Sequence, residues 1–597
     1  MDTVLTTSGI NNLINQYKIN EQNRRIKPLE TRKSKYNNSS SAYGALSSRL
    51  DSFKSVLSKM KSTGSISIFT SKTTSLSNTN FLKATSTTSA SMGSYSLRVN
   101  QLAKSDIAVS KDFDTSSSGA NSIGITSGTY KFQLDTGDGS TGSYSSFISV
   151  DLEETDSNAS ILEKISSAIN QDKAVVESNS VTGVYSGGTT SFKININGTE
   201  TTITDSTATT YEELIDNIVN SISNDIDGVT AEKVVNGSDF SLKLTVDDPS
   251  KYISITHESG FDLVSDLGIS VSKEKGAAGT INASVFSANS GKSQLSFTSK
   301  ETGLDYRIKN LTDVSGNALN LLGLNLGTSR PAFDQDISPN TAGFIYSDIT
   351  SSNNQLNSKL TFNGLSVQRN STTINDLVTG VTLTLNSKMA ESDNDVNLTV
   401  TNDTSAIRSE IDGFVKKFND VYSFIKNNSL SDKGVRGAFV GDSTATDLRI
   451  KLGNLAYSQV NGITGSDFNK LSAIGITFTS TGGLSITDSS LLDNSLTNNI
   501  DEVEDLFNST NGIANQFYNF IEPYLESDGY ISNLKNSLDS NVTYLNDKIT
   551  KTQEQITKGS SVLRSRYEGL QKQLLILLNS QELYNSFANY PSSTGFF

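Results

Sequence analysis

A long apolar seam near the C-terminus is the feature that most constrains how this chain can fold. Between Ile531 and Ala588, large apolar side chains recur at steps of three and four residues, with extra steps of four near Leu538 and Leu563, which is the spacing that lets one helix pack along another. An unbroken helix of this length would extend roughly 80 Å, more than a compact domain requires. The seam therefore predicts a leg or stalk made of paired helices. Its members are Ile531, Leu534, Leu538, Val542, Leu545, Ile549, Ile556, Leu563, Tyr567, Leu570, Leu574, Leu577 and Tyr584.

A second seam with the same spacing lies near the N-terminus, between Tyr43 and Met60. Because most of the chain separates the two seams, we expect its two ends to meet and everything between them to be an insertion. Such stripes commonly form only the core of a helical bundle, and direct partner binding is the alternative interpretation. Both hold if the bundle is also the assembly surface. The second seam consists of Tyr43, Leu46, Leu50, Phe53, Leu57 and Met60.

The composition predicts sheet domains between the two seams. The 597 residues are enough for several domains, because single cores rarely exceed about 250 to 300 residues. Only 35% of the residues are hydrophobic, and Ser, Thr, Asn and Gly are abundant, which is typical of small sheet domains with many turns. The predicted fold class is therefore α+β and multidomain. A helical, coiled-coil leg is formed by the N- and C-terminal segments, and β-rich head domains are inserted between them.

The middle of the chain repeats one pattern, a hairpin followed by an amphipathic helix. The first copy begins at Gly128 to Val150, and the second has strand residues Phe192 to Ile196 and a helix over Tyr211 to Ile222. Strands that could close the first copy come only later, at residues 281 to 308. We therefore predict that the second copy, residues 178 to 275, is inserted inside the first.

These patterns divide the chain into six predicted segments. The first is weakly patterned and contains a basic run from Lys18 to Lys35, so we expect it to be mobile until a partner orders it. The segments are a flexible N-terminal arm (1–42), the N-terminal helix of the leg (43–80), the first part of a head base domain (81–115), inserted outer head domains (116–324), the second part of the base domain (325–402), and a C-terminal helical leg with a small hairpin and a long coiled-coil helix (403–597).

Charge and residue usage exclude several classes of function. The net charge of -14 and pI near 4.8 oppose nucleic-acid binding, because phosphates would repel such a surface. The absence of cysteine excludes disulfides, thiolate metal sites and cysteine nucleophiles. Residues 1–5 lack the basic and apolar regions of a conventional secretory signal, and no stretch approaches the ~18 apolar residues of a membrane span. We therefore expect no membrane insertion.

Candidate catalytic and ligand motifs fail on their spacing. The single histidine, His257, makes neither a metal cluster nor a triad, and we interpret it as an ordinary surface residue. Asp135 to Gly139 resembles the start of a calcium loop, but Phe147 stands where the bidentate glutamate belongs, so a hairpin tip is expected. Ser290 to Ser293 resembles the end of a phosphate loop, yet Phe286 replaces its first glycine. The sequence predicts no enzyme and no cofactor, although a pair of carboxylates could still cut glycosides.

Several segments together resemble the flagellar filament cap family, also called flagellar hook-associated protein 2. Their order and spacing agree over roughly two-thirds of the chain. The sharpest match is Asn363-Gly364, Arg369-Asn370-Ser371, Ile374-Asn375-Asp376-Leu377 and Gly380-Val381-Thr382-Leu383; others are Gly93 to Leu97, Phe418-Asn419-Asp420-Val421-Tyr422, Gly441-Asp442-Ser443, Ile474-Gly475-Ile476 and Gly512-Ile513-Ala514. The nested middle units and the basic arm depart from the family pattern.

The resemblance implies an extracellular bacterial protein at the flagellum tip, exported through the flagellar type III apparatus. It also implies a ring-like homo-oligomer that helps exported flagellin to fold and insert, and an export chaperone as a further partner. Alternatives are another axial protein, such as a hook-filament junction protein or a flagellin, and an adhesin whose heads bind host glycans. We expect partner or subunit contacts at Leu46, Leu50, Phe53, Leu57, Leu545, Ile549, Ile556, Leu563, Leu570 and Leu574.

Overall fold

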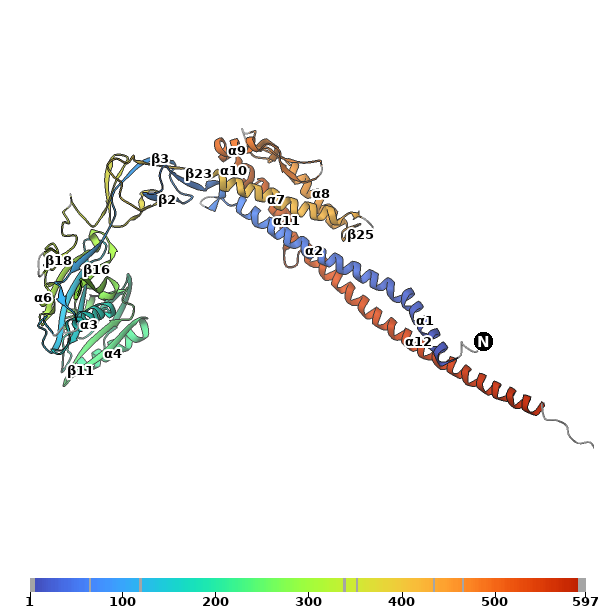
Figure 1. The fold of residues 1–597 in the computed structure, drawn as a ribbon, viewed down its shortest axis with the longest axis horizontal. Coiled ribbons are helices and arrows are strands. Elements are labelled where there is room, and N and C mark those ends of the chain that lie inside the picture. Colours follow the sequence, from blue (N-terminus) through green and yellow to red (C-terminus); the bar gives the residue numbers. More distant parts are fainter. Residues whose placement is uncertain are drawn as a thin grey trace, which may run out of the picture. The chain divides into compact units, whose positions relative to one another are not determined.

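The computed structural model describes residues 6–63, 66–116, 121–336, 340–350, 353–432, 435–463, 467–480 and 482–588. It divides into two compact units (Figure 1). The leg unit combines Met1–Thr73 with Asn402–Phe597, and the head unit is Thr74–Thr401. The leg unit is mainly helical and the head unit mainly β-sheet. The predicted α+β fold class, with a leg formed by both ends of the chain, is confirmed.

The N-terminal part of the leg unit is helical almost from its start. Helix α1 (Thr7–Glu21) continues through the π-helical turn η1 (Gln22–Ile26) into α2 (Lys27–Met60). The prediction of a flexible arm over residues 1–42 is therefore wrong for its described residues. The apolar side chains of this segment are sparse, but Ile10, Ile14 and Ile26 are all buried. Packing of one thin face stabilises a helix whose sequence alone gives a weak pattern.

The C-terminal half of α2 lies in a helical bundle. Its side chains Leu46, Leu50, Phe53 and Leu57 are fully buried in the same core as residues of α7 and α11. Phe53 lies within ring-contact distance of Phe414, Phe418 and Phe517, with centroids 5.7, 6.1 and 5.6 Å away. The other elements of the bundle are α7 (Thr404–Asn428), α8 (Ser443–Tyr457), the hairpin β26 (Ile476–Phe478) and β27 (Leu484–Ile486), α9 (Ser489–Asn498), α10 (Ile500–Asn508), α11 (Ile513–Leu525) and the first turns of α12 (Tyr530–Ala588).

The head unit begins with a base domain whose two sheets enclose one core. One sheet has the order β1-β23-β3-β19-β20 and the other β2-β22-β21. Asn363 and Gly364 both adopt positive φ, 47° and 83°, in the two-residue turn between β19 and β20, which is the backbone that an Asn-Gly hairpin favours. The strands are β1 (Lys72–Leu76), β2 (Leu82–Ser86), β3 (Gly93–Gln101), β19 (Ser358–Phe362), β20 (Leu365–Arg369), β21 (Thr373–Val378), β22 (Val381–Leu385) and β23 (Val396–Asn402).

The outer head contains two further cores. Residues 174–269 form one, and the other combines residues 108–169 with residues 277–344. Ile148 and Val150 share the second core with Leu295, Phe297 and Ile308. We call residues 174–269 the inner domain and the segments that flank them in sequence the host domain. One seven-stranded sheet, β10-β9-β13-β14-β7-β6-β17, runs through both, which the separate copies of the sequence pattern did not indicate.

The boundaries of the outer head lie outside the expected 116 and 324. Strands β4 and β18 pair with each other, and β4 also pairs with β16, so residues 105–109 and 343–344 belong to the host domain. The elements of the outer head are β4 (Ser105–Val109), β5 (Phe113–Asp114), β6 (Gly128–Gly137), β7 (Ser143–Leu152), α3 (Asn158–Gln171), β8 (Val175–Glu177), β9 (Thr190–Ile196), β10 (Thr199–Asp205), α4 (Tyr211–Asp225), β11 (Val229–Asn236), β12 (Asp239–Val246), β13 (Tyr252–Gly260), α5 (Leu263–Asp266), β14 (Lys273–Lys275), β15 (Ile281–Asn289), β16 (Lys292–Thr302), β17 (Ile308–Ser315), α6 (Ala318–Leu321) and β18 (Gly343–Phe344).

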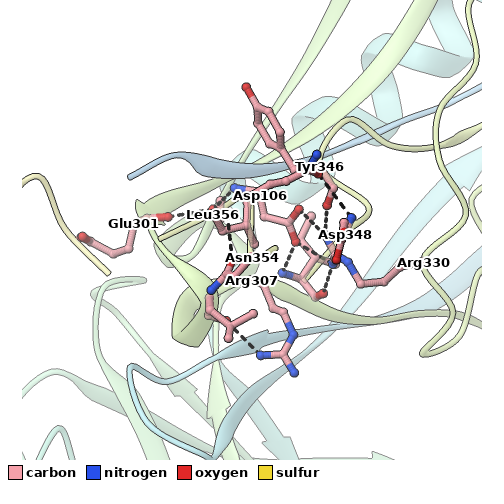
Figure 2. A network of polar contacts seen from close by, with 12 residues as sticks. Asp106, Glu301, Arg307, Arg330, Tyr346, Asp348, Asn354 and Leu356 are labelled. Carbon is pink, nitrogen blue, oxygen red and sulfur yellow. Dashed lines mark hydrogen bonds and ion pairs between the residues drawn. The ribbon is translucent and has the colours of Figure 1, made fainter. Parts of the chain in front are cut away.

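A buried ion pair joins Asp106 of β4 to Arg330 in the host domain (Figure 2). Both oxygens of Asp106 accept hydrogen bonds from the Arg330 guanidinium, at 2.9 and 2.7 Å, and Asp106 is fully buried. Arg330 also donates to the carbonyls of Ile308 and Tyr346. The guanidinium lies 3.9 Å from the centre of the Phe344 ring. One arginine therefore joins four chain segments that are distant in sequence.

Removing one member of this pair is expected to destabilise the head unit strongly. Asp106→Ala leaves the Arg330 charge buried without its partner, which should lower the free energy of unfolding by about 3 to 5 kcal/mol. The double variant with Arg330→Met should recover much of that loss, because no charge stays buried. Chemical unfolding followed by hydrogen exchange at β4 and β17 measures both. A single variant as stable as the parent chain would contradict the assignment.

Two carboxyls, the half-buried Asp172 and the buried Glu274, make the junction of the host and inner domains sensitive to pH. Burial raises the pKa of Asp172 to about 7, although the Ala277 N–H donates to it at 2.7 Å. Burial likewise raises the pKa of Glu274 to about 7, against a hydrogen bond from Ser270. The folded state therefore binds these protons between roughly pH 4 and 7, where the unfolded chain has released them.

Stability of the outer head should consequently fall as pH rises through that window. We expect slower hydrogen exchange of β14 and β8 at pH 5.5 than at pH 8, after correction for the intrinsic exchange rate. Asp172→Asn with Glu274→Gln should flatten this difference, because neither amide titrates. An undiminished pH dependence in the double variant would show that other groups are responsible.

Candidate functional site

The two ends of the chain form a rod in which α1 and α2 run antiparallel to α12 (Figure 1). Residues nearer the C-terminus of α12 contact residues nearer the N-terminus of the α1–η1–α2 segment. Ser40 donates to Asp539 at 3.0 Å, and Gln22 donates to Gln553 at 3.2 Å. Further along, Arg564 donates to Asn11 at 2.7 Å. The register of the rod is thus set by polar contacts along its length.

The packed seam of the rod is thin and partly polar. Its buried apolar side chains include Ile10 and Ile14 on one side and Leu545 and Ile556 on the other. Small polar residues of α12, Thr552 and Ser560, are also buried along this seam. The Thr552 and Ser560 hydroxyls donate to carbonyls of their own helix, so neither requires a partner across the seam. Such a seam buries little apolar area, so this pair of helices should be held less firmly than the bundle.

The ten predicted contact residues fall into two groups. Leu46, Leu50, Phe53 and Leu57 are bundle core, and α12 meets this part of α2 only with its first turns, around Ile531, Leu534 and Leu538. The expected meeting of the two seams is therefore wrong for these four side chains beyond the first turns of α12, because the antiparallel register places residues 545–564 beside α1, η1 and the start of α2. On α12, Leu545 and Ile556 are buried, Ile549, Leu563 and Leu574 are partly buried, and Leu570 is half exposed.

Sequence reasoning missed the residues that line the N-terminal side of the rod. Ile10 and Ile14 form a short apolar face with the neighbouring Leu13 and Tyr17, but the polar residues after Tyr17 hid its continuation at Ile26. Ile26 lies in the π-helical turn η1. One turn with an extra residue shifts the helical periodicity, so a pattern search at a fixed period loses the face there. A search that allowed this shift could have found it.

The last turns of α12 extend past the described start of α1 and carry many exposed apolar side chains (Figure 1). Residues 574–578, Leu-Leu-Ile-Leu-Leu, are apolar all round the helix, a pattern that is normally buried. Exposed apolar patches of this kind mark interaction sites. We call this segment, residues 570–587, the apolar tip. Its exposed large apolar side chains are Leu570, Leu575, Ile576, Leu577, Leu578, Leu583, Tyr584 and Phe587.

The three sequence motifs considered as catalytic or ligand sites lie on a strand or in hairpin turns. His257 is exposed on β13, 3.7 Å from an Asp262 oxygen. Asp138 lies in the turn between β6 and β7, where it binds Lys273 at 2.9 Å, and Gly291 makes the turn between β15 and β16 with φ of 76°. In the described ranges, no three His, Cys, Asp or Glu side chains gather as metal ligands. Among the same residues, no helix has the length and apolarity needed to cross a bilayer.

A helical rod with a bare apolar end, joined in one chain to sheet domains, defines a structural protein that works by assembling with other chains. Two family models match this sequence. The one described as flagellar hook-associated protein 2 N-terminus matches residues 8–106, and the one described as its C-terminus matches residues 356–576. Together they span more than half of the chain. The chain belongs to the flagellar hook-associated protein 2 family, the flagellar filament cap proteins.

Curated relatives and solved structures carry the same family name. B-type flagellar hook-associated protein 2 of Pseudomonas aeruginosa is 24% identical over 375 residues, which are 60% of this chain and 73% of that protein. Flagellar hook-associated protein 2 of Salmonella typhimurium is 25% identical over 235 residues, 38% of this chain but only 49% of the relative's length. The crystal structure of the D1-D2-D3 domains of the flagellar cap protein FliD from Escherichia coli matches with a TM-score of 0.46 and 21% identity, covering 83% of this chain and 99% of that one.

Proposed function

We propose that this chain forms a homo-oligomeric plate at the tip of the flagellar filament and promotes folding and insertion of exported flagellin there. The apolar tip of α12 is the observation that carries the proposal. Eight large apolar side chains on one helix end are exposed in the single chain. Burying one leucine contributes about 1.5 to 3 kcal/mol, so this segment has a strong tendency to bind another apolar surface.

The rod supplies the adaptability that such a role needs. Its seam contains Thr552 and Ser560 at buried positions, so the contact between the two helices is weak for its length. A leg of this kind can exchange helix partners as subunits arrive, whereas the bundle core around Phe53 stays packed. We infer that the tip contacts either a neighbouring subunit or flagellin. We also infer that an export chaperone covers the tip before the chain leaves the cell by the flagellar type III route.

Electron microscopy of the purified full-length chain tests the proposal. We expect ring-like oligomers of the chain alone and the same particles seated on the ends of flagellar filaments. A bacterial strain lacking its own cap gene should regain long filaments when this chain is expressed with its matching flagellin. A chain that stays monomeric at all concentrations and never occupies filament ends would contradict the proposal.

A further inference from the structure

A cleft of about 640 Å³ lies between the host and inner domains of the outer head, and the edge of a strand forms one of its walls. One wall is the run Ser145 to Ser149 of β7. The facing wall is the run Gln171 to Val175 together with Glu177, which leads from α3 into β8. Side chains along a strand alternate between its two faces. Because five consecutive residues of β7 line one cleft, the cleft meets this strand along its backbone edge.

The edge of β7 in the cleft is without a neighbouring strand. Strand β6 pairs with β7 along the full length of β7, on its other side. On the cleft side, β14 pairs only with Tyr144 and Ser145. Within the described parts of the chain, the backbone hydrogen bonds of residues 147–151 go to β6. Alternate residues beyond Ser145 therefore turn backbone N–H and C=O groups toward the cleft with no ladder partner.

The facing wall is a side-chain surface. Strand β8 ends the three-stranded sheet β11-β12-β8 and pairs with β12 alone. Val175 and Glu177 line the cleft, whereas Val176 between them is buried, so β8 turns one face toward the cleft. The open backbone edge that borders the cleft is therefore that of β7.

The edge of β7 also lacks the features that protect exposed edges. Proteins usually guard such edges with charged residues, proline or a bulge. The segment Ser146 to Val150 contains no charge and no proline, and its pairing with β6 shows no register shift. The cleft lining includes Phe147 of this strand, whose side chain is 51% exposed. An occupant would cover this apolar side chain as well as satisfy the backbone.

The charged groups of the cleft favour an occupant that brings N–H donors. Asp172 and Glu274 both line the cleft, and burial raises the pKa of each carboxyl. Three lysines also line the cleft, namely Lys131 on β6, Lys173, which lies 3.9 Å from Asp247, and Lys275, which lies over the Tyr144 ring. A carboxylate in such a place is stabilised by hydrogen bonds from N–H groups. An extended polypeptide supplies one N–H per residue, whereas a small anion supplies none.

We propose that this cleft binds an extended segment of another protein chain, which adds as a strand to the free edge of β7 beyond Ser145. Backbone hydrogen bonds supply the contact, and the surface around Phe147 accepts alternate side chains of the guest strand. The partner is an unfolded or loop segment with β-forming, uncharged residues, because three lysines and three carboxylic acids line the cleft. The proposal concerns the outer head alone, so it does not depend on the leg or on the capping role.

Hydrogen exchange of the full-length chain with a peptide probe tests this site. The probe is a decapeptide of alternating threonine and valine with one lysine at each end. In the free protein, alternate amides of residues 147–151 should exchange as fast as those of exposed loops. The probe should slow their exchange at least tenfold and bind saturably. A probe N-methylated at every second residue should bind at least tenfold more weakly, because it lacks one row of donors.

A matched pair of variants distinguishes strand addition from non-specific binding of the probe. Phe147→Lys places a charge beside the edge and should weaken probe binding at least tenfold, since its exposed side chain permits the change without disturbing the fold. Val184→Lys adds the same charge at a side chain that is 77% exposed and does not line the cleft, and it should leave binding unchanged. Slow exchange of all these amides in the free chain, no saturable binding, or equal binding of both probes would overturn the proposal.

Discussion

Replacing Leu570 and Leu577 together by aspartate should abolish filament elongation while leaving the fold of the chain intact. The two side chains are 50% and 65% exposed, so neither supports the core of the leg. Each leucine contributes about 1.5 to 3 kcal/mol when buried against a partner, so the pair accounts for about 3 to 6 kcal/mol of docking energy. That is roughly two to four orders of magnitude in affinity. Filament length, measured by electron microscopy in a complemented strain, reports the effect.

The control for this experiment adds the same charge without removing apolar surface. Asn579→Asp with Gln581→Asp places two carboxylates on the same helix, at exposed polar positions. We expect filaments of normal length from this variant, and circular dichroism should show equal helix content in both. If the leucine variant also builds normal filaments, the apolar tip is not the docking surface. Equal loss in both variants would show that charge alone disrupts assembly.

Truncating Phe53 to alanine should destabilise the leg unit by about 3 to 5 kcal/mol, the range for a large aromatic side chain in a packed core. Phe53 is fully buried, and its ring contacts those of Phe414, Phe418 and Phe517. These rings come from α7 and α11, so the cavity would loosen three helices together. Urea unfolding monitored by circular dichroism measures the loss. Tyr544→Ala is the control, because that side chain is 60% exposed on α12, and its effect should stay within about 0.5 kcal/mol.

A loss below about 1 kcal/mol for Phe53→Ala would mean that the bundle repacks around the vacancy. A motility defect has a different cause in a bundle-core variant than in the variant of the apolar tip. Substitutions at Leu46, Leu50, Phe53 or Leu57 remove function by unfolding the bundle, because all four side chains are inaccessible in the single chain. Only exposed residues of α12 can test docking directly.

Long periodic elements were predicted well from the sequence. The C-terminal helix was expected over Ile531 to Ala588 and is observed as Tyr530–Ala588, because its apolar repeat continues over many turns. The Asn363-Gly364 hairpin also follows from local chemistry, since these two residues tolerate positive φ. The N-terminal segment was missed because its large buried apolar side chains are sparse among the described residues, namely Ile10, Ile14 and Ile26, and α12 supplies the surface that buries them.

The candidate site was predicted only in part. The seam on α12 was recognised, and two of its members, Leu570 and Leu574, lie in the apolar tip. Which seam residues stay exposed depends on where α1 begins relative to the end of α12. That register is set by contacts such as Arg564 with Asn11, which join residues from opposite ends of the chain. No local pattern encodes such a pairing.

The sequence by itself determined the family, the helical leg, the sheet-rich insertion and the absence of cysteine chemistry, because each depends on residue type or short-range spacing. Tertiary structure alone decided that Asp106 meets Arg330, that β14 stops pairing with β7 after Ser145, and that the end of α12 is left bare. These features depend on how distant segments align in space. A side chain's burial is a property of its neighbours, and those neighbours are chosen only when the chain has folded.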